Sequence, residues 1–211
     1  ADGYQFVANT TDGTLWLLPD EGKATPLHLI DRMSANPGRG RIFNIAKQDD
    51  STLLIATYGA GLIIYDTTTG HTTRFSSHDE SPLFHSDYLF DILADRSGGI
   101  WVASVATGVT WLGHTQPSIA RYVKPIPNKN NDRDNGISRI FKLRDGDIAV
   151  TAFDFRTLVL DTINGTLSKL PSPYGDIIAY TTDQHGHEWM ITRSGGLMSD
   201  GKQITKTTTI G

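Results

Sequence analysis

Short runs of alternating apolar and polar residues, separated by glycine-rich turns, recur along the whole chain. The stretch from Tyr88 to Leu112 shows the pattern most regularly, because three β-branched and aromatic runs are separated by turns at residues 95–99 and 106–108. Runs of this kind predict short β-strands joined into antiparallel hairpins. No segment keeps a helical periodicity, so the pattern predicts an all-β protein with little helix.

The same unit of strands and turns occurs five times. The residue that ends the second predicted strand of each unit recurs at close to the interval of about 40–50 residues that is typical of a propeller blade. These five reference residues are Asn9, Thr57, Ser104, Ala152 and Thr192. The recurrence predicts a repeat architecture.

Other positions keep a constant distance from the reference residue. Three residues before it stand Phe6, Leu54, Trp101, Ala149 and Trp189, which we expect to pack one sheet on the next. Four residues after it stand Gly13, Gly61, Gly108 and Gly196, where the chain must turn tightly into the third strand. Fifteen residues before it stand Ile42, Leu89, Ile137 and Ile177, which mark a first strand nearest the propeller axis.

These columns predict that residues 1–211 form a single, partial β-propeller. Its four-stranded antiparallel sheets are about five consecutive blades, at approximately residues 4–29, 42–75, 89–122, 137–170 and 177–208. The first unit lacks its inner strand, so we expect three strands there and an incomplete arc of a larger propeller. Blades stack radially because a single blade cannot bury both of its apolar faces. The alternative is a β-sandwich whose spacing is coincidental.

Charge and composition restrict the classes of binding partner and of chemical site that this chain can have. The 19 basic and 23 acidic residues give a net charge of −4 with both signs scattered, so we expect no nucleic-acid binding by this region. The absence of cysteine excludes disulfides, thiolate metal sites and a cysteine nucleophile. No apolar run reaches the roughly 18 residues of a membrane span, so we expect contact with a membrane only through a parent chain.

Three stretches carry a family resemblance. They are the Asp-x-x-Gly-Gly-x-Trp-Val turn from Asp95 to Val102, the Thr-x-x-x-Gly-Leu from Thr57 to Leu62, and the run from Tyr65 to Gly70 followed by Thr73-Arg74-Phe75. The pattern resembles the two-component regulator propeller repeat and covers almost the whole chain. It is weaker in the fourth unit, where Ala149 and Arg156 replace an aromatic residue and a glycine.

The resemblance implies a sensor rather than a catalyst. Such repeats form the periplasmic sensor region of Bacteroidetes-type hybrid two-component systems, whose parent chains carry a histidine kinase and often a transcription regulator elsewhere. It implies an extracytoplasmic region of an inner-membrane protein, a small saccharide ligand, contacts with other propeller blades or domains of the parent chain, and a possible homodimer. It implies no cofactor.

Candidate ligand-binding residues lie where the loops between second and third strands and the linkers between blades emerge on one face. The loops supply Tyr58, Asp154, Arg156 and Arg193, and the linkers supply Arg39, Arg41, His85, Asp87, Tyr88, Arg133 and Arg139. Arginine would pair with the carboxylate or sulfate group of an acidic sugar, and tyrosine would stack on a sugar ring. The alternative is that these are solvated loop residues or contacts between blades.

Arg156 stands out because the other four units have glycine at its position. It follows Phe153, Asp154 and Phe155, an unusually aromatic loop, and a departure from a structural repeat can mark function. The structural interpretation is that Phe153 and Phe155 fill the space left by Ala149.

We find no catalytic residues and expect no metal. His185-Gly186-His187 is interpreted as a solvated turn on the opposite face, and residues 130–136 depart from the spacing of a calcium loop. No nucleophile motif or phosphate-binding glycine motif occurs. The alternatives to a sensor are a polysaccharide lyase or hydrolase propeller and a non-catalytic protein-interaction scaffold.

Overall fold

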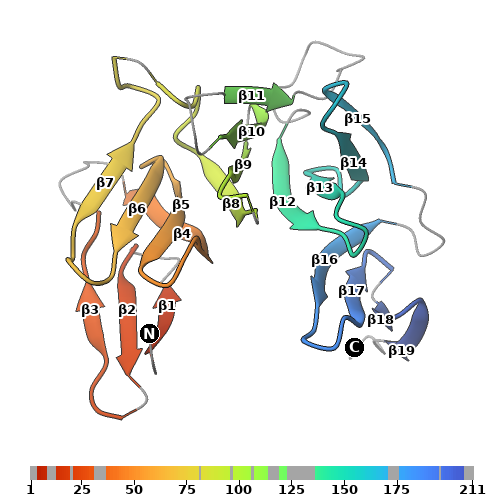
Figure 1. Ribbon diagram of the computed structural model, residues 1–211, viewed down its shortest axis with the longest axis horizontal. Helices are drawn as coiled ribbons and strands as arrows, with labels where there is room; N and C mark the ends of the chain where they lie inside the picture. The colour runs from red at the N-terminus through yellow and green to blue at the C-terminus, as the bar shows by residue number, and fades with distance from the viewer. Residues whose placement is uncertain are drawn as a thin grey trace.

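The computed structural model contains five antiparallel sheets arranged as an arc (Figure 1). It describes residues 4–8, 13–19, 21–30, 37–80, 82–95, 97–105, 107–113, 119–122, 136–170, 176–194 and 196–206. These residues form strands, turns and loops, and none belongs to a helix long and apolar enough to cross a membrane. The all-β prediction is confirmed.

The strands follow one another within each sheet in chain order. The first blade contains β1 (Tyr4–Ala8), β2 (Leu15–Pro19) and β3 (Thr25–Leu27). The second blade contains β4 (Pro37–Lys47), β5 (Thr52–Tyr58), β6 (Leu62–Asp66) and β7 (Thr72–Phe75). The third blade contains β8 (Leu89–Ala94), β9 (Ile100–Ser104), β10 (Gly108–Leu112) and β11 (Ile119–Tyr122).

The last two blades repeat the same order. The fourth contains β12 (Ile137–Lys142), β13 (Ile148–Ala152), β14 (Thr157–Asp161) and β15 (Thr166–Lys169). The fifth contains β16 (Ile177–Thr182), β17 (Glu188–Thr192), β18 (Gly196–Ser199) and β19 (Lys202–Lys206). Four four-stranded sheets and one three-stranded sheet are thus present, and the first blade is the three-stranded one.

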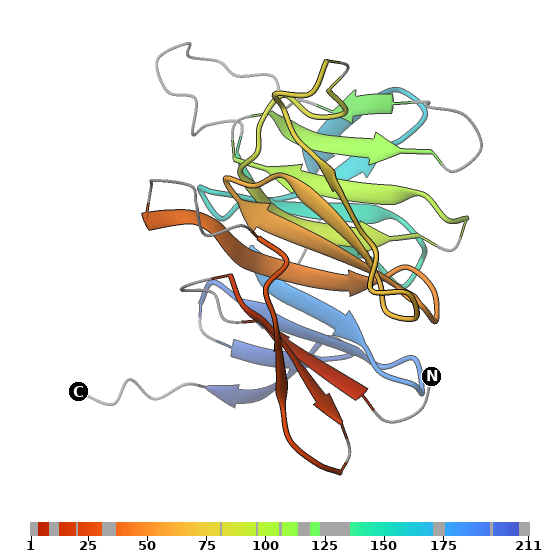
Figure 2. The ribbon, with the colours of Figure 1, turned by 90° about the vertical axis from the view of Figure 1, so that its left-hand side faces the viewer.

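The first strand of each four-stranded blade faces the centre of the arc, and the fourth lies at its periphery (Figure 1). We call β4, β8, β12 and β16 the inner strands. β4 begins at Pro37, in the segment between the first two predicted blades that was expected to be a linker. Proline is compatible with this position because it is tolerated at the first residue of a strand. Figure 2 shows the beginning of β4 projecting beyond the neighbouring strands on one side of the arc. Arg39 and Arg41 therefore lie on a strand, which corrects their expected place in a linker.

The apolar core is divided into clusters that lie between successive blades. Leu54 packs with Leu89 and Val102 between the second and third blades. Trp101 packs with Ile137 and Val150 between the third and fourth. In the first four units the residue three positions before the reference residue thus packs on the following blade, as the repeat predicts. Burying apolar faces against neighbouring sheets is what makes radial stacking favourable.

The first three blades share one turn geometry at the glycine that follows the reference residue by four positions, and Gly196 of the fifth blade does not have its positive φ. Gly13, Gly61 and Gly108 have φ values of 74°, 77° and 76°, a region that is costly for residues with a side chain. At Gly61 an added Cβ would lie 2.1 Å from the carbonyl oxygen of Phe75. This position therefore requires glycine for both its conformation and its close backbone approach.

Candidate functional site

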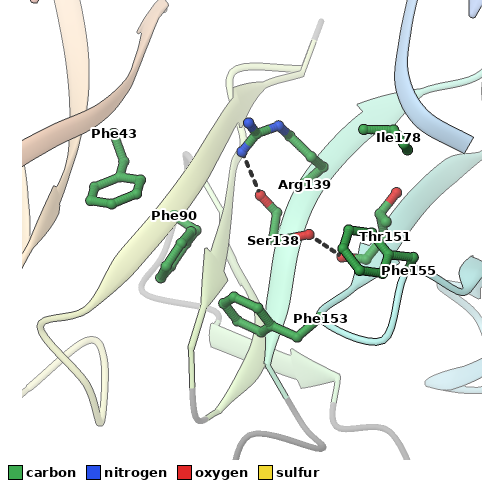
Figure 3. Close-up of a pocket in the computed structure, with 8 residues that line it drawn as sticks. All are labelled: Phe43, Phe90, Ser138, Arg139, Thr151, Phe153, Phe155 and Ile178. Carbon is green, nitrogen blue, oxygen red and sulfur yellow. Dashed lines mark hydrogen bonds between the residues drawn. The ribbon is translucent and has the colours of Figure 1, made fainter. Parts of the chain in front are cut away.

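A cleft of about 280 Å³ opens at the inner strands and the β13–β14 loop. Its lining comes from β4, β8, β12, β13 and β16 and from that loop (Figure 3), and comprises Phe43, Phe90, Ser138, Arg139, Thr151, Phe153, Phe155 and Ile178. The starts of the inner strands and the loops between second and third strands both lie on this side. The cleft is therefore on the face where the sequence places the candidate residues.

A β-bulge in each inner strand supplies one lining residue. The pairing of the inner strand with its neighbour skips a residue between Ile42 and Asn44, between Leu89 and Asp91, between Ile137 and Arg139, and between Ile177 and Ala179. The four skipped residues are Phe43, Phe90, Ser138 and Ile178, and all four line the cleft. A bulge redirects a side chain away from the regular alternation of the strand, so the repeat itself builds the site.

One wall of the cleft is aromatic. The Phe90 ring lies 4.6 Å from that of Phe43 and 4.9 Å from that of Phe153, measured between centroids. Behind this wall Tyr58 contacts Phe43 at 5.5 Å and Tyr88 at 4.7 Å. Tilted and edge-to-face pairs at these distances are favourable. The wall is therefore a preorganised apolar surface that flat or apolar ligand faces can contact.

The polar groups of the cleft lie on its β12–β13 side, next to Phe155 and Ile178 (Figure 3). The Ser138 hydroxyl donates to the carbonyl of Thr151 at 3.0 Å, and Thr151 Oγ1 donates to the carbonyl of Ile177 at 2.8 Å. Arg139 Nη1 donates to the carbonyl of Ser138 at 2.9 Å, and the Arg139 side chain is exposed to solvent (Figure 3). A cation and hydroxyl groups thus line the cleft together with an aromatic wall, an arrangement suited to a ligand with both a ring and polar substituents.

Asp91 lies beside the cleft and connects three blades. It is 3% exposed, and its carboxylate accepts hydrogen bonds from Asn44 Nδ2 on β4 and from the backbone N–H of Ile140 on β12, the latter at 2.8 Å. Burial raises the pKa of the Asp91 carboxyl, while these hydrogen bonds and the charge of Arg139 act in the opposite direction. Asp91 therefore fixes the relative placement of the inner strands that form the cleft.

The β13–β14 loop adopts a different turn from its counterparts. Phe155 has a φ of 69°, one residue before the position at which Gly61 takes its positive φ. A bulky residue in this region is an outlier that costs about 1–2 kcal/mol. The Phe155 side chain is 45% exposed, and the guanidinium of Arg193 lies 5.1 Å from the centre of its ring.

The structure brings four of the predicted site residues to the cleft or its border. Arg139 lines it, Arg193 stacks on the lining residue Phe155, and Tyr58 and Tyr88 support the aromatic wall. Of the candidates, Arg139 alone appears among the lining side chains of the described cleft. Arg193 lies at the rim of the cleft, and Tyr58 and Tyr88 pack against its aromatic wall.

Asp154 and Arg156 lie in the same loop but bind each other. Both side chains are about half exposed, and Arg156 Nε donates to Asp154 Oδ2 at 2.5 Å. Arg156 is therefore neutralised locally, and the feature that distinguishes this loop is the strained Phe155. Phe155 is exposed and Ala149 packs between the fourth and fifth blades, near Phe141, so the interpretation that both loop phenylalanines fill the space left by Ala149 is wrong.

Asp87 has a structural place. It is 7% exposed, its carboxylate accepts hydrogen bonds from Ser76 Oγ at 3.0 Å and His78 Nδ1 at 3.1 Å, and its carbonyl accepts one from the N–H of Gly59 at 2.8 Å. Burial acts to raise the pKa of the Asp87 carboxyl, but the hydrogen bonds that the carboxylate accepts from the Ser77 N–H, Ser76 and His78 lower it below its ordinary value. Asp87 connects the linker to the β5–β6 turn through hydrogen bonds, and it is not among the residues that line the cleft.

Two of the remaining candidates, Arg41 and His85, are not among the residues that line the cleft. Arg41 and His85 are exposed, and the backbone of Arg41 pairs with that of Tyr58. The backbone of Arg39 lies in β4, and Arg133 is outside the described residues, as are residues 130–135 of the stretch compared with a calcium loop. His187 Nδ1 bonds Asp200 Oδ2 at 2.6 Å in an exposed turn. Within the described ranges, no group of three or more His, Asp or Glu side chains could hold a metal ion.

The sequence reasoning missed the lining residues at the bulges. Phe43, Phe90, Ser138 and Ile178 form a column fourteen residues before the reference residues. Each follows an apolar residue that marks the start of an inner strand. The sequence feature that could have indicated them is this column itself. It varies in residue type, directly follows a column that is always apolar, and has phenylalanine at two of its four positions.

Comparisons with known proteins identify solved structures that share the fold. No protein-family model matches the chain, and no curated protein matches it. The extracellular domain of the hybrid two-component system BT3049 from B. thetaiotaomicron matches with a TM-score of 0.66 at 16% identity, over 96% of this chain and 29% of that one. The corresponding domain of BT4673 from the same organism matches with a TM-score of 0.62 at 17% identity, over 96% and 31%.

The same fold occurs in a protein of a different kind. A streptogramin B lyase matches with a TM-score of 0.65 at 15% identity, over 94% of this chain and 65% of the lyase. The matches establish the propeller fold, and this chain spans less than a third of either sensor chain. At these identities they do not distinguish a sensor from an enzyme.

Proposed function

We propose that this chain is part of the extracytoplasmic ligand-sensing propeller of a membrane-bound hybrid two-component sensor, and that it recognises an oligosaccharide or glycan fragment. The observation that carries the proposal is the aromatic-walled cleft, built by the bulge of every inner strand. Support for the sensor class comes from the shared fold with the extracellular domains of BT3049 and BT4673 and from the propeller-repeat motifs.

A saccharide suits the two sides of the cleft. The apolar face of a sugar ring can lie against Phe43, Phe90 or Phe153, while its hydroxyl groups reach Ser138 and Arg139. A ligand placed there touches residues of four blades at once. Its binding energy can therefore favour one relative placement of the blades, and a parent chain with a membrane helix and histidine kinase can transmit such a shift.

Binding can be tested with the purified chain and a panel of neutral and acidic glycan fragments. We expect at least one fragment to raise the melting temperature in a concentration-dependent way, and Phe153→Ala to abolish that shift. Ile163→Ala is the matched control, because Ile163 is 92% exposed in the β14–β15 turn at the other end of the same blade. No stabilisation by any fragment, or an equal loss in the control, would contradict direct saccharide sensing.

Cleavage of a polysaccharide is the second candidate function, since the propeller fold also occurs in an enzyme, the streptogramin B lyase. The lining of the described cleft contains a cation and hydroxyl groups but no carboxylate or imidazole that could act as a base. Incubation of the purified chain with the polysaccharides from which the binding fragments derive distinguishes the two functions. Release of unsaturated or reducing-end products that is lost in Arg139→Gln would favour the enzyme, whereas binding without product favours the sensor.

A further inference from the structure

The arginines on the cleft face differ in how their charge is compensated. Arg156 is paired with Asp154 within its own loop. Within the described residues Arg139 makes no ion pair, and its one hydrogen bond, to the carbonyl of Ser138, uses a single N–H of the five that a guanidinium carries. Its remaining donors are open to a ligand in the cleft.

Asp91 interacts electrostatically with Arg139, but the two side chains form no ion pair. Both oxygens of Asp91 are occupied, by Asn44, by the N–H of Ile140 and by its own neighbour Ile92, whose N–H donates at 3.0 Å. Asp91 is also buried while Arg139 is exposed. The positive charge that the cleft presents to solvent is therefore that of Arg139.

A second cation lies at the rim of the cleft. Arg193 lies over the ring of Phe155 and, within the described ranges, has no carboxylate partner. Phe155 is held in a strained conformation that leaves its ring exposed between Arg193 and the cleft. Strain maintained at an exposed residue beside a cleft is a feature of binding sites, since a fold alone would favour glycine there.

We infer that the cleft selects an anionic saccharide, one whose ring carries a carboxylate or sulfate group, with Arg139 binding the anion and the aromatic wall binding the ring. This rests on the proposed saccharide recognition and narrows its ligand class. A planar guanidinium fits a carboxylate or sulfate through two parallel hydrogen bonds. Arg193 adds a second positive charge at the rim, and that charge favours the same ligands.

The inference is tested by isothermal titration calorimetry with matched pairs of fragments. Each uronate-containing oligosaccharide is compared with its carboxyl-reduced form, and each sulfated oligosaccharide with its desulfated form. We expect at least about a tenfold preference for one anionic member, a difference of about 1.4 kcal/mol, and a weakening of its binding as sodium chloride is raised. Inorganic sulfate alone is a further arm and should bind far more weakly than the anionic fragment.

Variants assign the preference to residues. Arg139→Gln should bring the affinities for the two members of the pair to within about twofold, and Arg193→Gln should reduce the preference partially. Arg144→Gln is the control, because Arg144 lies in the β12–β13 turn at the opposite end of the fourth blade. Circular dichroism checks that each variant is folded, and Arg139→Lys, which keeps the charge, should retain part of the preference.

The outcomes separate the inference from the proposed function. Equal binding of both members of every pair, a preference that survives Arg139→Gln, or equally tight binding of inorganic sulfate would overturn the inference while saccharide binding stands. Binding of no saccharide at all would overturn the proposed function itself.

Discussion

Asp66 shows how a single carboxylate holds a turn of this propeller. Its Oδ1 accepts hydrogen bonds from the Thr68 N–H at 2.8 Å, the Thr68 hydroxyl at 2.6 Å and the Thr69 N–H at 2.9 Å. These bonds, that of the Thr68 hydroxyl above all, lower the pKa of Asp66 from 3.8 to about 2. The charged form is therefore favoured in the folded chain.

The Asp66 turn gives a prediction about acid stability. A carboxyl group whose pKa is lower in the folded state stabilises the fold above its unfolded pKa, and this contribution is lost as the pH falls through the folded pKa. We expect the melting-temperature difference between wild type and Asp66→Ala to be constant above pH 5 and to shrink between about pH 4 and pH 2. Thr68→Val should raise the pKa of Asp66 in an NMR titration, and an unchanged pKa would contradict this account.

Phe155 gives a prediction in which stability and binding change in opposite directions. Phe155→Gly removes the left-handed strain of a bulky residue, so we expect the chain to become more stable by about 1 kcal/mol in urea unfolding. The same change removes an aromatic ring of the cleft rim and releases Arg193 from it, so ligand affinity should fall. Phe155→Ala keeps the strain and loses the ring, which separates the two effects. Lower stability of the glycine variant would show that the ring supports the fold.

At the scale of the strand, the four bulges explain which part of the site could be predicted from sequence. Constant spacing of apolar residues and glycines predicted the blades, because radial packing and tight turns restrict those positions strongly. The bulge residues were missed because a bulge depends on the pairing of two strands, and their column in the sequence does not show by itself that the side chains turn toward a cleft. Arg139, predicted from its residue type, lines the cleft, whereas Asp87, predicted from its linker position, is buried and bonded to residues 9 to 28 positions away in the chain.

Asp91 gives a prediction at the scale of neighbouring blades. In Asp91→Asn an amide N–H₂ replaces one of the two carboxylate oxygens. It would face an N–H group that now donates to that oxygen, so this buried donor would lose its acceptor. We expect a loss of about 1–3 kcal/mol in urea unfolding at neutral pH. Asp145→Asn, in the exposed β12–β13 turn, is the control and should have a smaller effect.

The pH dependence of Asp91 has the opposite sign to that of Asp66. Burial raises its folded pKa, so wild type gains stability relative to Asp91→Asn as the pH falls through the raised pKa toward the ordinary value of 3.8. The cost of Asp91→Asn should therefore be larger near pH 4 than at pH 7. A cost that falls with decreasing pH would mean that the hydrogen bonds from Asn44 and Ile140 outweigh burial.

At the scale of the whole molecule, the arc has an outward sheet face at each end. Leu15 packs toward the second blade, so the next residue, Trp16, points away from it and is 36% exposed. In the fifth blade Met190 packs toward the fourth, and its neighbour Ile191 is 46% exposed on the other side. In the interior sheets the second strands β5, β9 and β13 are buried on both faces, whereas these two end sheets carry large apolar side chains in contact with water.

These outward faces predict self-association of the isolated chain. Sheet faces of this kind are covered by neighbouring blades in a propeller, and in the isolated chain a second copy is the surface available to cover them. We expect the sedimentation coefficient to rise with protein concentration, and the double variant Trp16→Thr, Ile191→Thr to suppress this rise with little change in melting temperature. Ile163→Thr, which changes a more exposed apolar residue in a turn, should leave association unchanged. A wild-type chain that stays monomeric over the whole concentration range would show that these faces are not adhesive, and ligand titrations could then be interpreted without an oligomerisation step.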